Sequence, residues 1–238
     1  MKKIQFKDLI LFENADYLAI NKPYGVSTLE DRVENVNILA SAKEVFPDIQ
    51  VCHRLDKDTS GLLVLAKNAD AYRHLALQFQ NREVDKTYHA VVHGNTNFNH
   101  ELIELPLTVK GHGIVKWDTQ NGKESHTLFT TLQNFKSCSL VECKPVTGRR
   151  HQIRVHLKYA KHSILADSMY DGTLLFLSHI KRNYKPNQRD EKPLINRMPL
   201  HAYSISFKLL DGNTQYIEAP YPKDYEILLK QLYKYATI

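Results

Sequence analysis

The sequence is poor in cysteine, and its cysteines follow no pairing pattern. Cys52, Cys138 and Cys143 are an odd number and show no CxxC spacing. The residues therefore indicate neither a disulfide framework nor a zinc site, and we expect free thiols in a reducing compartment. The twelve histidines are scattered without an HExxH pattern or a histidine–cysteine group, so no metal site is expected either.

Long apolar runs are also missing. The longest, "DLILF" and "GLLVLA", are the size of a strand and far shorter than a membrane span. The first residues, "MKKIQFKDLILFENAD", contain no signal-peptide core or cleavage site, which favours the cytoplasm. There is no repeat, low-complexity stretch or Gly/Ser-rich linker. We therefore expect residues 1–238 to form a single domain, with a basic insertion or loop at 174–199.

Short strand-like segments alternate with three convincing helical patterns, which predicts an α+β fold. "LILF" and "YLAINK" flank the turn-prone "ENAD" and predict a hairpin, whereas "GLLVLAK" predicts a buried strand. Asn68 is expected to cap a helix whose buried face comprises Tyr72, Leu75, Ala76 and Phe79. A second helix is predicted from near Thr147, and the last one lies in "KDYEILLKQLYKYA".

Acidic residues are absent between positions 144 and 166, within a chain of net charge +6. Arg150, Arg154 and Lys158 are spaced as a stripe along the helix predicted there. A solvated helix face is one explanation, but an electropositive wall for a nucleic acid is favoured. Residues 174–199 are also rich in Lys and Arg, and a solvated loop and a phosphate-binding arm are equally good interpretations of them.

Asp56 and Asp58 stand directly before the apolar strand, in "VCHRLDKDTSGLLVLAK". A carboxylate beside apolar walls stays ionised as a nucleophile only with a cationic partner, such as Arg54 or Arg154. The alternative is that both acids merely hydrogen-bond the backbone of a turn. The residues alone favour this alternative.

Five motifs, taken together, resemble those of the RluA-type (RluA/RluC/RluD-like) pseudouridine synthases. "HRLDKDTSGLLVLAK" resembles the family signature HRLDxxTSGLLxxAK, and "NKPYGVS" resembles its opening NKPxG motif. "FQNREVDKTYHAVVHG" is similar to its K-x-Y strand, "TGRRHQIRVHL" to its TGRxHQIRxH motif and "PLHAYSISF" to its late LHA strand. The motifs occur in the family's order and span most of the chain. The chain is thus identified as a compact member without the N-terminal S4 module that many relatives carry.

The resemblance implies an isomerase, of the intramolecular transferase class, that converts uridine in RNA to pseudouridine. It implies a mixed, mainly antiparallel sheet flanked by helices, with a central RNA-binding cleft and no metal or organic cofactor. The partner would be an rRNA or tRNA stem-loop, with no role for a membrane; monomer is the default state. Relatives often have Gly–Asp where this chain has Ala166–Asp167, and a positive φ at Ala166 would be strained.

The resemblance also assigns residues. Asp56 would attack the ribose C1′ or the uracil C6, Arg154 would keep it charged, and Tyr88 would stack on the uracil. Ile153 would form an apolar wall behind the base, and Arg54 would enter the RNA stack after base flipping. The remaining expected RNA-binding or framing residues are Lys86, Arg149, Arg150, Lys158, Lys181, Arg182 and Lys185.

Two other functions compete with this one. A catalytically silent RNA-binding or ribosome-assembly factor would keep the fold without needing Asp56, Tyr88 and Arg154 together. A hydrolase would use Asp56 to cleave a glycosidic bond and would require a second carboxyl group, for which Asp58 is a weak candidate.

Overall fold

A computed structural model describes residues 5–30, 36–184 and 191–238. The chain divides into two units, which are described separately. Unit 1 comprises residues 1–87 and 201–220, and unit 2 comprises residues 88–200 and 221–238. The chain crosses between them three times, and strands β5 (Asp85–His93) and β11 (Leu200–Lys208) have residues in both.

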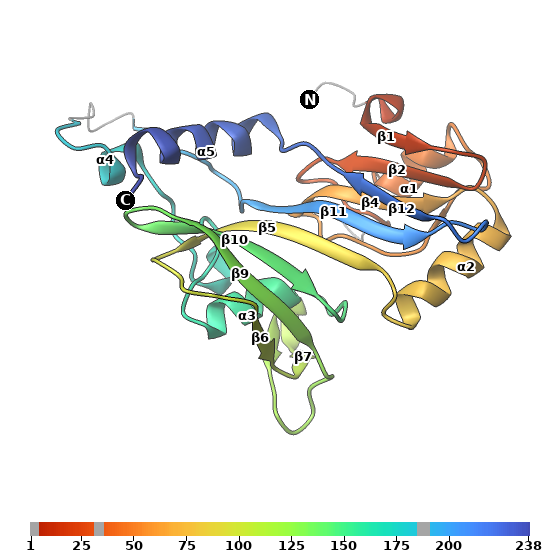
Figure 1. Cartoon of the computed structure of the whole chain (residues 1–238), viewed down its shortest axis with the longest axis horizontal. Helices are drawn as coiled ribbons and strands as arrows, with labels where there is room; N and C mark the ends of the chain where they lie inside the picture. Colours follow the sequence, from red (N-terminus) through yellow and green to blue (C-terminus); the bar gives the residue numbers. More distant parts are fainter. Residues whose placement is uncertain (1–4, 31–35, 185–190) are drawn as a thin grey trace. The chain divides into compact units, whose positions relative to one another are not determined.

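Unit 1 is built around β4, whose residues are all buried (Figure 1). Antiparallel β2 flanks it on one side and parallel β11 pairs with it at Ser60 and Gly61, while β3 pairs with its last residues. Beyond these, β1 pairs with β2 and β12 pairs with β11, both antiparallel. The elements are the short 3-10 helix η1 (Phe6–Leu9), β1 (Ile10–Glu13), β2 (Tyr17–Lys22), α1 (Ile38–Lys43), β3 (Gln50–Val51), β4 (Ser60–Ala66), α2 (Ala69–Gln80) and β12 (Thr214–Glu218).

Local side chains explain why these elements begin where they do. Asn14 Oδ1 accepts the backbone N–H groups of Asp16 and Tyr17, which closes the predicted hairpin. Asn68 Oδ1 accepts the N–H of Ala71, so the predicted cap of α2 is confirmed. Gly61 has φ +109, and a Cβ there would lie 2.2 Å from the Ala202 carbonyl oxygen, so only glycine permits the approach of β11.

The predicted buried face of α2 is partly wrong. Leu75 is buried, but Tyr72 is 38% exposed and Gln78 is 4% exposed. Gln78 takes an inward position because its amide donates to the Lys208 carbonyl and accepts the Lys208 N–H, which satisfies both ends of the side chain.

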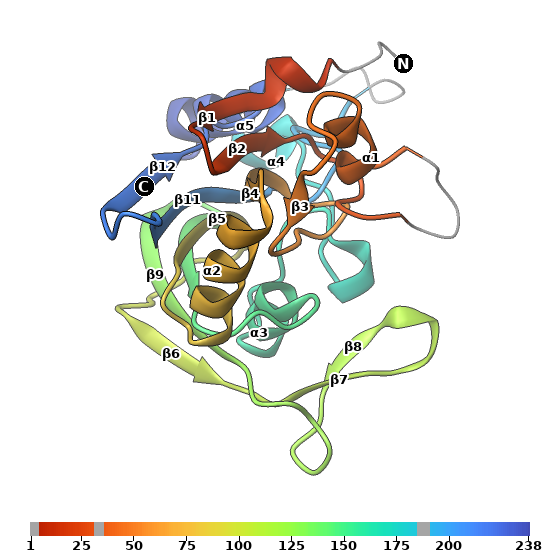
Figure 2. The same ribbon diagram turned by 90° about the vertical axis from the view of Figure 1, so that its right-hand side faces the viewer.

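Unit 2 contains an antiparallel array in the order β5–β10–β9–β6. A separate two-stranded hairpin, β7–β8, projects beside it in Figure 2. The elements are β6 (Glu101–Glu104), β7 (Leu107–Val109), the 3-10 helices η2 (Gly111–Gly113) and η3 (Ser168–Tyr170), β8 (Val115–Trp117), β9 (His126–Asn134), β10 (Cys138–Pro145), α3 (Gln152–Tyr159), α4 (Leu177–Ile180) and α5 (Lys223–Tyr235).

The two longer helices of unit 2 pack on opposite faces of this array. Ala90 and Val92 of β5 join the cluster that includes Ile153 and Leu157 of α3, whereas Val91 joins the cluster of α5. Alternate residues of a strand point to opposite faces, so one strand supports both helices. The sheet is mixed and mainly antiparallel with helices on its faces, and the predicted α+β class is confirmed.

The second helix begins later than predicted. It runs from Gln152, and residues 147–151 form the turn before it. Gln152 Oε1 accepts hydrogen bonds from the Thr147 hydroxyl and the Arg149 N–H. These bonds hold the preceding residues in a turn, which apolar periodicity alone does not show.

Candidate active site

Asp56 lies in the turn directly before β4, partly buried, with its backbone fixed on both sides. The Thr28 hydroxyl donates to the Leu55 carbonyl at 2.9 Å and accepts the Leu55 N–H at 3.2 Å. The Asp56 carbonyl accepts the Thr59 N–H at 3.0 Å. The sequence thus places a carboxylate in a fixed turn directly before a buried strand.

A buried lysine ties the two N-terminal motifs together. Lys22, with an exposed fraction of 0%, donates to the carbonyls of Pro23 at 2.9 Å, Val26 at 2.7 Å and Lys57 at 3.2 Å. The Gly25 N–H also donates to the Lys57 carbonyl. The "NKPYG" segment therefore braces the residue next to Asp56. Lys22 was not among the predicted site residues, although a lysine that ends an apolar strand is a signal of a buried polar role.

His53 and Ser60 fix the turn from either end. The Val64 N–H donates to His53 Nε2 at 3.0 Å, and the His53 ring stacks on Phe79 at 4.6 Å. Burial, followed by the charge of Lys86, lowers the pKa of His53 to about 3, so the ring is neutral. Ser60 Oγ is hydrogen-bonded to His201 Nδ1 at 3.0 Å.

Two predicted RNA-binding residues of unit 1 differ in their surroundings. Lys86 Nζ lies 5.9 Å from the centre of the Phe79 ring, and burial lowers its pKa. Arg54 is exposed beside the turn. Exposure leaves Arg54 accessible to a large ligand, whereas Lys86 is packed within the unit.

In unit 2, Arg154 is held by a buried carboxylate that the sequence analysis did not pair with it. Its Nε and Nη2 donate to Asp167 Oδ2 and Oδ1 at 2.8 and 2.7 Å. The two side chains are 6% and 2% exposed. The guanidinium lies 4.8 Å from the centre of the Tyr170 ring, whose hydroxyl is hydrogen-bonded to His151 Nδ1. The orientation of Arg154 is therefore fixed from two directions.

The loop that presents Asp167 depends on an unusual backbone. Ala166 has φ 57, the positive value that the sequence analysis identified as strained. The Ala166 N–H donates to the Thr173 carbonyl, and the Gly172 N–H donates to the Asp167 carbonyl. A Cβ at Gly172 would lie 1.9 Å from the Ile164 carbonyl oxygen, so glycine is required there.

The predicted cationic stripe is wrong. Arg150 precedes α3, Arg154 is buried against Asp167, and Lys158 Nζ lies 2.7 Å from Asp171. Both acids lie just beyond the acid-free stretch, so two of the three cations of the predicted stripe have acidic partners.

The other predicted site residues have varied settings. Ile153 is 6% exposed within the α3 cluster, and half-buried Tyr88 packs against the same cluster. Arg149 is exposed, and its Nε donates to the Glu124 carbonyl. Lys181 and Arg182 follow α4, and Lys185 lies outside the described residues. Unit 1 thus holds Asp56, Arg54 and Lys86, and unit 2 holds the rest; the pairing of Asp56 with Arg154 stays a prediction.

Metal-ligating side chains do not cluster in the described parts of the chain. No group of three or more His, Cys, Asp or Glu side chains there could hold a metal ion. None of the helices described is long and apolar enough to cross a membrane.

Comparison with known proteins shows which family the chain resembles. The family model described as RNA pseudouridylate synthase matches residues 16–159. Ribosomal large subunit pseudouridine synthase C of Vibrio vulnificus is 32% identical over 87% of this chain and 63% of its own length. The Pasteurella multocida synthase C is 33% identical over 97% and 70%, and synthase D of Borreliella burgdorferi is 32% identical over 94% and 68%. The chain therefore spans about two thirds of the length of these curated relatives.

Two solved human structures are similar in fold. RNA pseudouridylate synthase domain containing 4 has a TM-score of 0.73 at 23% identity, covering 96% of this chain and 95% of its own. Domain containing 1 has a TM-score of 0.70 at 26% identity, covering 93% and 87%. With its RluA-type motifs, this chain belongs to the RNA pseudouridylate synthase family.

Proposed function

We propose that the protein isomerises uridine to pseudouridine in the RNA of the large ribosomal subunit. The observation that carries the proposal is the fixed backbone of Asp56 in the turn directly before β4, within a chain of this family. The choice of ribosomal over transfer RNA follows the relatives, which are named for the large ribosomal subunit.

In the proposed reaction, the Asp56 carboxylate attacks the ribose C1′ or the uracil C6 of a uridine flipped out of its RNA. The glycosidic C1′–N1 bond breaks, the base turns, a C1′–C5 bond forms, and the bond from Asp56 to the substrate breaks, which returns the free carboxylate. The proton on C5 is lost to solvent while N1 gains one, so substrate and product have the same atoms. The step needs no water, in contrast to hydrolysis.

Each remaining site residue has a task in this proposal. Arg154 keeps Asp56 ionised, and Asp167 acts as a positioning residue because it holds the Arg154 guanidinium by two hydrogen bonds. Tyr88 stacks on the uracil and exchanges a proton at the sugar, and Ile153 forms the apolar wall. Arg54 enters the space that the base leaves. Exposed Arg149 and Arg150 contact phosphates of the RNA backbone. Lys86 supports the structure around the active site. Lys158 is a weaker phosphate ligand because Asp171 pairs with it.

The test is tritium release from ribosomal and transfer RNA labelled at uridine C5, using wild type, Asp56→Ala and Asp70→Ala. Asp70 is the matched control because its side chain is 81% exposed at the start of α2. We expect release from ribosomal RNA with wild type and Asp70→Ala, and background release with Asp56→Ala. Free uracil would instead indicate the hydrolase. Tight RNA binding without release would indicate the assembly factor, which the presence of Asp56, Tyr88 and Arg154 disfavours.

A further inference from the structure

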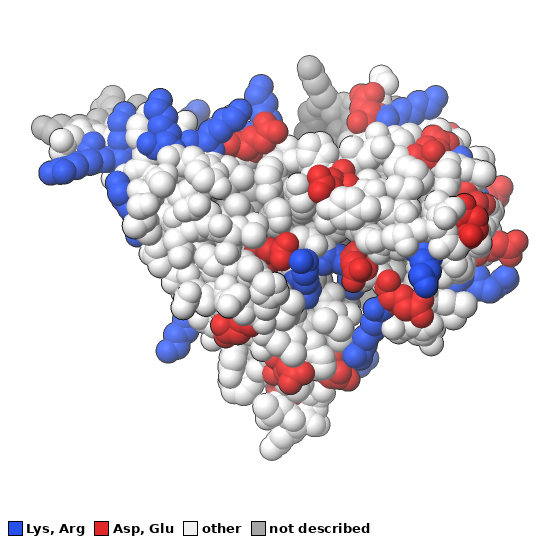
Figure 3. Space-filling view, in the orientation of Figure 1, with Lys and Arg blue, Asp and Glu red and all other residues white. Residues whose placement is uncertain are grey.

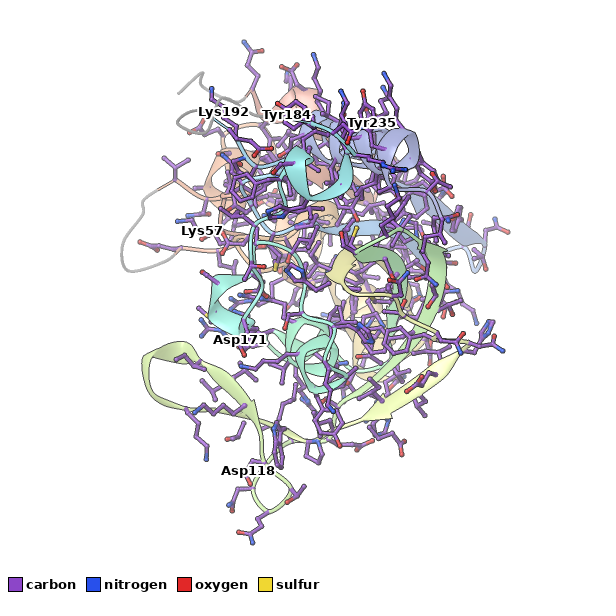
Figure 4. All side chains as sticks on the ribbon, turned by 90° about the vertical axis from the view of Figure 1, so that its left-hand side faces the viewer. Lys57, Asp118, Asp171, Tyr184, Lys192 and Tyr235 are labelled. Atoms are coloured by element: carbon purple, nitrogen blue, oxygen red, sulfur yellow. The ribbon has the colours of Figure 1, made fainter. Side chains whose placement is uncertain are left out.

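Basic side chains gather on one part of unit 2, around the end of α4 and the outer face of α5. Figure 3 shows blue Lys and Arg side chains along these helices, with red acidic side chains beside them at the start of α5. We define the α4–α5 basic surface as Lys181, Arg182, Lys192, Lys230 and Lys234, with the tyrosines Tyr184 and Tyr235. Figure 4 labels Tyr184, Lys192 and Tyr235 at the same end of the molecule.

Tyrosine rings hold the ammonium groups of this surface close together. Lys181 Nζ lies 4.9 Å from the centre of the Tyr235 ring and 5.3 Å from that of Tyr184. Lys234 Nζ lies 5.2 Å from the centre of the same Tyr235 ring, so one aromatic ring contacts two like charges. Lys230 precedes Lys234 by one helical turn and lies on the same face of α5. The charges are therefore preorganised.

Elsewhere in unit 2 several cations have acidic partners. Carboxylates lie within ion-pair distance of Lys110, Lys144, Arg154, Lys158 and Arg197. Within residues 5–30, 36–184 and 191–238, no ion pair joins an acid to a cation of the α4–α5 basic surface. Glu191, the nearby acid in sequence, is engaged instead with the backbone N–H and hydroxyl of Ser178. Glu226 lies one turn before Lys230 on α5, so the five cations of the surface stand beside one exposed acid of that helix, and this excess of positive charge predicts a polyanionic partner.

The packing of α5 favours RNA over a membrane surface. An interfacial helix inserts an apolar face into lipid. The apolar face of α5, formed by Tyr225, Leu228 and Leu232, is fully buried in the core of unit 2. Its exposed side carries Lys223, Lys230 and Lys234, which bind phosphates as point charges, beside Glu226, Ile227 and Tyr233. We propose that the α4–α5 basic surface binds the phosphate backbone of the substrate RNA outside the modified nucleotide; the choice of RNA rests on the proposed function.

The test compares the triple variant Lys181→Gln/Lys230→Gln/Lys234→Gln with the control Lys7→Gln/Lys43→Gln/Lys208→Gln. The control lysines are exposed in unit 1, and each triple variant lowers the net charge of +6 by three. Binding to protein-free large-subunit ribosomal RNA is measured across a salt series, and equal thermal melting confirms that both variants fold. Tritium release at saturating RNA is measured in parallel.

Loss of three phosphate contacts should make the plot of log K for RNA binding against log salt less steep, by about 2–3 in the magnitude of its slope. Between roughly 50 and 200 mM salt, wild type should then lose about 20- to 40-fold more affinity than the triple variant. The control should keep both the wild-type slope and the wild-type turnover at saturation.

Equal slopes for the triple variant and the control would overturn the proposal. So would a triple variant that loses binding to anionic phospholipid vesicles while its slope on RNA stays that of wild type. If wild type releases no tritium but the triple variant alone has a less steep salt dependence of RNA binding, the proposed function is wrong. The proposal that the α4–α5 basic surface binds RNA is then still supported.

Discussion

The buried ion pair of Arg154 with Asp167 can be compared with an exposed ion pair, Lys158 with Asp171, in the same unit. Arg154 Nη2 lies 2.7 Å from Asp167, and Lys158 Nζ lies 2.7 Å from Asp171. The Asp167 side chain is 2% exposed, whereas that of Asp171 is 75% exposed. An Asp→Asn change at each position removes the same charge at the same distance, so burial is the main variable.

Asp167→Asn should lower the free energy of unfolding by about 3–5 kcal/mol, because it removes the buried carboxylate that accepts two hydrogen bonds from Arg154. Asp171→Asn should cost no more than about 1 kcal/mol, because solvent screens an exposed pair. Asp171 has φ 66, a conformation that asparagine tolerates, so the control adds no backbone strain.

Urea denaturation measures both changes. With a slope of about 2–3 kcal/mol per molar urea, Asp167→Asn should lower the midpoint by roughly 1–2 M. A loss below about 1 kcal/mol at Asp167, or equal losses at the two positions, would refute the reasoning from burial.

Two further predictions concern strain and pH. Ala166→Gly should raise the free energy of unfolding by about 0.5–1 kcal/mol, since glycine relieves the positive φ but loses more entropy on folding; destabilisation in urea would contradict this. His53 is neutral in the folded protein with a pKa of about 3, against about 6.5 when unfolded, so stability falls as the pH drops below the unfolded value. Between about pH 7 and pH 5, His53 should account for roughly 2 kcal/mol of this loss. His53→Gln should remove that part of the pH dependence, and an unchanged slope would show that the ring titrates normally.

The sequence predicted well what adjacent residues determine. Asn68 caps a helix through a bond to a residue three positions away, and the apolar run after Asp56 forms β4. Gln78 was missed because its polar side chain is buried by partners 130 residues away, on Lys208. The pattern of apolar residues along a helix predicts that a glutamine faces outward, because it takes no account of hydrogen bonds to distant backbone groups.

The errors at the candidate site have the same origin. Arg154 was assigned to an exposed stripe because its partner, Asp167, lies 13 residues further on. Arg197 was counted among the cations of residues 174–199, yet it is 5% exposed and bound to Asp224 by two hydrogen bonds. Whether a cation has an acidic partner depends on the fold. The ordered motifs that revealed the family can be recognised in the sequence without knowing the fold.

The division of unit 1 between the two ends of the sequence affects when that unit can fold during synthesis. Ser60 at the start of β4 pairs with His201 of β11, 141 residues later. At about 5–20 residues per second, the ribosome needs roughly 10–30 s to supply that partner after β4 has been made. Until then, the edge of β4 at Ser60 and Gly61 lacks its partner and is open to pairing with another chain. The strand that follows the proposed nucleophile is thus made early and completed late, and its Ser60–Gly61 edge stays unpaired with β11 while the residues between them are made.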